Sequence, residues 1–141
     1  MTNTLIQKIN QSSWWHVPPR DPGAYKKRGK FFASTYLQAE FYGKPNDEPE
    51  KVKIRNPVFG FSEKEILSKL FGVEKAKNLL SATLSEDENW YQKRIDLDQK
   101  MHERAKELRH DAIVLLTKNG KKELKKQRKP NSIELNLVFK V

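Results

Sequence analysis

A short aromatic strand that runs directly into a capped helix is the feature that most constrains this fold. The stretch Gly29–Gly43 reads GKFFASTYLQAEFYG, and its two phenylalanines predict a buried strand, Phe31–Ala33. A hydroxyl before a helix can accept a free backbone N–H, so Ser34 or Thr35 predicts the start of a helix over Thr35–Tyr42. Such a junction brings hydroxyl and N–H groups to a sheet edge, where a phosphate or ribose can be held.

Length and composition predict one domain over residues 1–141, with an N-terminal arm over residues 1–12. The 141 residues are 36% hydrophobic and 33% charged, which allows one core under a polar exterior. The absence of cysteine excludes disulfides, thiolate zinc sites and cysteine nucleophiles. No apolar run approaches a membrane span and the N-terminus has no apolar signal core, so we expect a cytoplasmic protein without a membrane partner.

Hydrophobic periodicity predicts strands towards both ends of the chain and helices in its middle. The expected strands are Trp14–Val17, Phe31–Ala33, Lys51–Arg55, Asp111–Thr117 and a last one that begins at Ile133. The expected helices are Thr4–Gln11 (a helix or ordered arm), Thr35–Tyr42, Ser62–Phe71, Val73–Thr83 and a long one from Ser85 to Arg109. We expect Arg20–Lys30 to be a loop. This order of elements indicates an α+β fold.

Three local signals support the helical middle and the strand before it. Ser62 and Glu65 have the spacing of a capping box, and Gly72 predicts the end of that helix. The long helix carries one apolar stripe, formed by Trp90, Leu97, Met101, Ala105 and Leu108. In Lys51–Arg55, apolar and basic residues alternate, which is typical of a half-buried strand.

Several short motifs follow one another in an order that resembles the ADP-ribosyltransferase family, especially its small phage- and toxin-associated members. These motifs are Trp15-His16, Gly29–Thr35, Ala39–Gly43, Arg55-Asn56-Pro57, Asp111–Val114 and Glu134–Phe139. They span most of the chain. The resemblance implies an α+β fold with a split pair of short mixed sheets. It also implies NAD as the substrate from which ADP-ribose is transferred to a macromolecular acceptor, either protein or nucleic acid.

The same resemblance implies roles for individual residues. His16 would hold the ribose of NAD, Ser34 and Thr35 would support the site, and Tyr36 would stack on nicotinamide, with Tyr42 as the alternative ring. Glu134 would stabilise the oxocarbenium ion that forms when nicotinamide leaves, as carboxylates do in glycosidases. Arg20 and Arg28 would bind the pyrophosphate from the basic loop, whose Tyr25 could stack on adenine.

These residues also have ordinary structural interpretations, which the sequence leaves open. His16 can be a packed histidine at a strand end, and Ser34 or Thr35 can serve only as a helix cap. Glu134 lies five residues before Phe139, whereas the family's glutamate lies four residues before the corresponding aromatic residue. Because a shift of one residue moves a strand side chain to the other face, Glu134 reaches the site only if a bulge or a different register restores it.

A net charge of +10 supports a second hypothesis, a non-catalytic basic protein that binds nucleic acid or an acidic protein. The segment 118–129 is the densest basic run, and its expected phosphate contacts are Lys121, Lys122, Lys125, Lys126 and Arg128. Binding of that kind would weaken as salt rises. The spacing of the histidines and acids resembles no metal site, and we expect none.

Overall fold

The computed structural model describes residues 2–21, 23–40, 43–84, 90–116 and 133–138 of the chain. In these ranges the helices are α1 (Thr2–Gln11), α2 (Ala24–Arg28), α3 (Tyr36–Ala39), α4 (Glu63–Phe71), α5 (Val73–Leu84) and α6 (Trp90–Glu107). The strands are β1 (Trp15–His16), β2 (Lys30–Ala33), β3 (Pro57–Gly60), β4 (Ala112–Leu116) and β5 (Ile133–Leu137). The chain is therefore α+β, as its order of elements predicted.

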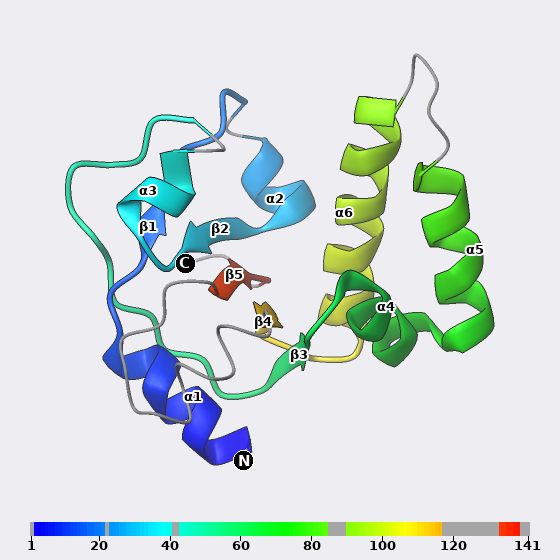
Figure 1. Ribbon diagram of the computed structural model, residues 1–141, viewed down its shortest axis with the longest axis horizontal. Coiled ribbons are helices and arrows are strands. Elements are labelled where there is room, and N and C mark those ends of the chain that lie inside the picture. Colours follow the sequence, from blue (N-terminus) through cyan, green and yellow to red (C-terminus); the bar gives the residue numbers. More distant parts are fainter. Residues whose placement is uncertain (1, 22, 41–42, 85–89, 117–132, 139–141) are drawn as a thin grey trace.

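The described strands form one mixed sheet in the order β1-β2-β5-β4-β3 (Figure 1). Neighbouring strands are antiparallel except β3 and β4, which run parallel. The sheet differs from the expected split pair because β5 pairs on both sides and so joins β2 to β4.

Helices cover this sheet on two sides (Figure 1). On one side α1 packs through Leu5 and Ile9 in a cluster with Val114, and we call this side the α1 face. On the other side α4, α5 and α6, which we call the helical layer, pack through residues such as Leu97 against Ile113. Because Ile113 and Val114 are neighbours in β4, the two clusters lie on opposite faces of the sheet.

The capping signals identify α4 correctly. The Ser62 hydroxyl accepts the Glu65 N–H at 3.2 Å, and a Glu65 carboxylate oxygen accepts the Phe61 N–H at 2.8 Å. The helix ends at Gly72, whose φ of 92° lies in the region that favours glycine. These contacts satisfy backbone N–H groups at the helix start, as a capping box does.

The apolar stripe of α6 is confirmed in part. Leu97, Met101 and Ala105 are buried in the cluster beneath the helical layer. Leu108 is 39% exposed, because α6 ends at Glu107 and the chain turns away from the stripe. The first member of the predicted stripe, Trp90, has no described side chain.

Two predicted elements are wrong. The expected loop Arg20–Lys30 contains the short helix α2. The expected strand Lys51–Arg55 pairs with no described strand, although Val52 and Ile54 are buried as the alternation predicted. The strand lies further along the chain, at Pro57–Gly60, because the pairing partner β4 lies beside that stretch.

Candidate functional site

His16 is buried in β1 with both ring nitrogens hydrogen-bonded. Its Nδ1 lies 2.7 Å from the Phe31 carbonyl oxygen, and its Nε2 lies 2.9 Å from the Tyr25 hydroxyl. A carbonyl can only accept, so Nδ1 carries the hydrogen and Nε2 accepts from Tyr25. Burial lowers the pKa of His16, which favours this neutral ring. The arrangement leaves neither nitrogen for a ribose hydroxyl.

Glu134 lies in β5 on the other face of the sheet. His16 is directly opposite Phe32, and Phe32 is directly opposite Leu135. Directly opposite residues share a face, so His16 and Leu135 both point to the α1 face. Glu134 is the neighbour of Leu135 and points to the helical layer. The structure therefore does not bring His16 and Glu134 into one cleft.

Ser34 and Thr35 join β2, α3 and β5. The Thr35 hydroxyl accepts the Gln38 N–H at 3.1 Å and so caps α3. The Ser34 hydroxyl, which is 1% exposed, donates to the Gln38 side chain at 2.7 Å and accepts the Ile133 N–H at 3.2 Å. Each of these hydroxyls has a structural role: Thr35 is the helix cap that the sequence predicted, whereas Ser34 ties α3 to β5.

Of the other predicted site residues, Tyr25 contacts His16, Arg28 lies in α2, and several fall outside the described residues. Tyr36 is 38% exposed, and its ring packs edge-on against Trp15 at a centroid distance of 5.1 Å. Arg20 is exposed. Residues outside the described ranges are Tyr42, Lys121, Lys122, Lys125, Lys126 and Arg128.

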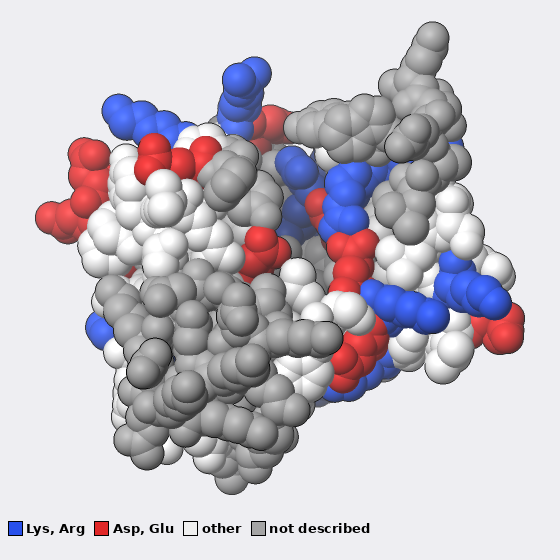
Figure 2. Space-filling view, viewed as in Figure 1, with Lys and Arg blue, Asp and Glu red and all other residues white. Residues whose placement is uncertain are grey.

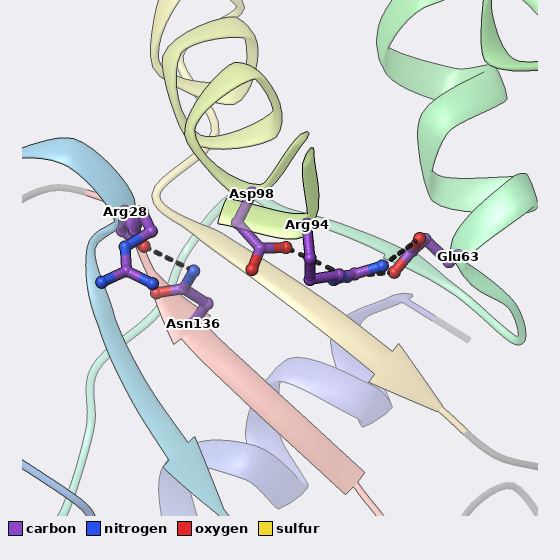
Figure 3. A network of polar contacts seen from close by, with 5 residues as sticks. All are labelled: Arg28, Glu63, Arg94, Asp98 and Asn136. Atoms are coloured by element: carbon purple, nitrogen blue, oxygen red, sulfur yellow. Dashed lines mark hydrogen bonds and ion pairs between the residues drawn. The ribbon is translucent and has the colours of Figure 1, made fainter. Parts of the chain in front are cut away.

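Polar contacts join α2 to β5 and, in a separate set beside them, α6 to α4 (Figure 3). The Asn136 amide donates to the Arg28 carbonyl at 2.7 Å. Arg94 donates to Glu63 through both of its terminal nitrogens and to Asp98 at 3.0 Å. Burial raises the pKa of Asp98, while the positive charge of Arg94 opposes that rise. Arg94 therefore links α6 to α4 within the helical layer.

Sequence reasoning missed this network and the buried histidine beside it. The spacing of Arg94 and Asp98, four residues apart in a helix, was the signal that could have identified their pair. His102 is 1% exposed, and among the described residues neither its Nδ1 nor Asn136 Oδ1 has a hydrogen-bond partner. A Cβ at Gly29 would lie 2.7 Å from Asn136 Oδ1 and 3.0 Å from His102 Nδ1. Gly29 therefore allows α2 to approach β5 and α6 closely.

The positive charge is distributed unevenly along the chain. Residues 63–107, which include the helical layer, hold nine Lys or Arg and ten Asp or Glu. The rest of the chain holds nineteen Lys or Arg and eight Asp or Glu. Figure 2 shows basic and acidic side chains intermixed over α5 and α6. The net charge of +10 therefore comes entirely from the sequence that builds the sheet, α1–α3 and their connections.

Comparisons with known proteins add no assignment: no protein family, no curated protein and no solved structure matches this chain. In the described ranges, no three His, Asp or Glu side chains gather as a metal site would require. None of the described helices has the length and apolar content that crossing a bilayer demands.

Proposed function

We propose that this protein binds nucleic acid through the basic part of the chain outside the helical layer. The observation that carries the proposal is the charge distribution, since residues outside 63–107 have eleven more basic than acidic side chains. Such an excess attracts polyanions over long range. Basic side chains that contact phosphates supply most of the affinity of non-specific nucleic-acid binding.

The densest basic segment begins and ends at adjacent points of the sheet. Residues 117–132 hold seven Lys or Arg and one Glu, and they connect β4 to β5. The flanking residues Leu116 and Ile133 are directly paired and buried. The sheet therefore supplies fixed attachment points for this charge.

The test is the salt dependence of binding to a labelled DNA duplex. If about seven phosphates are contacted, the slope of log K against log salt is about −6. A variant with Lys121, Lys122, Lys125 and Lys126 changed to glutamine is expected to lose most of this slope. The matched control removes the same charge from the helical layer, at Lys64, Lys75, Lys77 and Lys106, and is expected to keep most of it.

Three results would contradict the proposal. One is absence of binding at 50 mM salt. Another is equal weakening by the two sets of substitutions, because the location of the charge would then be irrelevant. The third is equally tight binding of polyglutamate, which would indicate an acidic protein as the partner.

A second candidate is an NAD-dependent ADP-ribosyltransferase. The observation that favours it is the adjacency of β1, β2 and β5, which carry three motifs of the family resemblance from distant parts of the sequence. Its carboxylate would be Glu134, with Arg28 for the cofactor phosphates. The burial of His16 on the other face counts against a site that includes both His16 and Glu134.

NAD distinguishes the two candidates. A transferase is expected to melt at a higher temperature in millimolar NAD and to consume it, and Glu134→Gln is expected to abolish the consumption. A protein that only binds nucleic acid is expected to show neither effect.

A further inference from the structure

Three exposed cations alternate with two buried residues in the segment that precedes β3. Lys51, Lys53 and Arg55 are exposed, while Val52 and Ile54 between them are buried in the cluster beneath the α1 face. Alternate burial of this kind directs the three cations away from the core. In an extended chain, side chains two residues apart are separated by roughly 6.6 Å, a distance close to that between neighbouring phosphates along a nucleic-acid strand.

Side chains from α1 and from the residue before β4 hold this segment in place. Asn10 bonds both backbone groups of Ile54: its Oδ1 accepts the N–H at 2.8 Å, and its Nδ2 donates to the carbonyl at 3.1 Å. The Asp111 carboxylate accepts the Arg55 N–H at 2.6 Å and the Asn56 N–H at 2.9 Å. Figure 1 shows the segment passing beside α1 on its way to β3. The row of cations is therefore attached to a fixed backbone.

The cations of this row are available to a ligand. Among the described residues, no acidic side chain forms an ion pair with Lys51, Lys53 or Arg55. Lys51 Nζ donates to the Gln11 carbonyl at 2.7 Å, which orients the ammonium without neutralising it. The neighbouring Glu50 is paired with Lys30 at 2.8 Å.

We propose that Lys51, Lys53 and Arg55 form a phosphate-binding ridge that contacts successive phosphates of one nucleic-acid strand. This inference rests on the proposed function and adds a particular surface to it. Contacts to phosphate position a nucleic acid without reading its bases. The ridge therefore binds DNA of different sequences with similar affinity. Because its backbone is already fixed, little backbone conformational entropy is lost on binding.

The experiment measures duplex DNA affinity and its salt slope for three forms of the full chain. The ridge variant carries Lys51→Gln, Lys53→Gln and Arg55→Gln. The control variant carries Lys64→Gln, Lys77→Gln and Lys106→Gln, three exposed lysines from residues 63–107. Three lost phosphate contacts reduce the magnitude of the slope by about 2 to 3 and weaken binding at 0.1 M salt by about 100-fold. The control is expected to change affinity by less than about threefold.

The outcomes separate the ridge from the proposed function. If the unmodified protein does not bind DNA at 50 mM salt, the proposed function fails, and the ridge fails with it. If the unmodified protein binds and the ridge variant behaves like the control variant, the ridge alone is overturned. Equal melting temperatures of the three proteins verify that folding is intact, which the exposure of all six side chains leads us to expect. A second DNA of unrelated sequence should show the same loss, and a loss confined to one sequence would overturn the assignment to phosphate.

Discussion

Asn10 takes the place of a strand neighbour for Ile54, and Asn10→Ala tests this role. The side chain forms two hydrogen bonds with the Ile54 backbone, at 2.8 and 3.1 Å. Each such bond contributes about 1 kcal/mol net, and a buried backbone group left without a partner costs about 1–3 kcal/mol. The bonds are part-buried, which permits some compensation by water. We therefore expect Asn10→Ala to lower the free energy of unfolding by about 2 kcal/mol.

Urea unfolding followed by tryptophan fluorescence measures this loss, because Trp14 is fully buried beside the segment. Asn10→Asp keeps an acceptor for the Ile54 N–H but loses the donor to its carbonyl, so a smaller loss is expected. Gln7→Ala removes an exposed side chain from the same helix and is expected to cost less than about 0.5 kcal/mol. If Asn10→Ala costs no more than Gln7→Ala, the fixed segment does not depend on Asn10 and the reasoning is refuted.

Two further predictions concern buried histidine and glycine. Burial lowers the pKa of His16 and His102 below the ordinary value of 6.5, so the unfolded chain binds protons more readily. The contribution of the neutral histidines to the free energy of unfolding is therefore fully present above about pH 6.5 and is lost as the pH decreases below it. Urea unfolding at pH 7.5 and 5.0 measures this loss, which should be smaller for His16→Asn than for the unmodified chain. Gly29→Ala should lower the free energy of unfolding by about 3 kcal/mol or more, because φ is 78° and a Cβ would lie 2.2 Å from the Leu137 carbonyl oxygen. Gly72→Ala shares the unfavourable backbone conformation, with φ of 92°, but has no atom within 4 Å of its Cβ position, so it should cost less, about 1–2 kcal/mol. Equal losses for the two variants would show that the close contact at Gly29 contributes nothing.

Sequence patterns predicted the elements whose signals are local. The Ser62 cap and the Gly72 stop depend on neighbours within one or two helical turns, and both are present. The periodic stripe of α6 is present at Leu97, Met101 and Ala105. The fate of Lys51–Arg55 depended on a distant partner. Its alternation of burial was predicted correctly, but a strand also needs a neighbour with free backbone groups. Here the Asn10 side chain takes the place of a neighbouring strand. The alternation of apolar and basic residues carries no information about which group will do so.

The same limit applies to the candidate site. Sheet register decides which residue of β5 lies on the same face as His16. In the sequence, the only sign of that register was that Glu134 is offset by one residue from the family spacing. The structure agrees with that indication, because Leu135 occupies the row that contains Phe32 and His16. The sequence offered a packed histidine as one interpretation of His16, and the structure agrees with it. The sequence could not decide between the two interpretations, since both hydrogen-bond partners of His16 come from other elements.

Register also decides which function this fold can perform without rearrangement. A carboxylate on the face of His16 would have to replace Leu135, which is fully buried between Phe32 and Val114. An isolated charge at such a position is strongly unfavourable, and the described side chains around it form a buried apolar cluster. On the opposite face, Glu134 has no histidine from β1 beside it. Catalysis that couples His16 to Glu134 would therefore require both a different register and an open core. Binding through exposed cations requires neither, because Lys51, Lys53 and Arg55 already face the solvent on a fixed backbone.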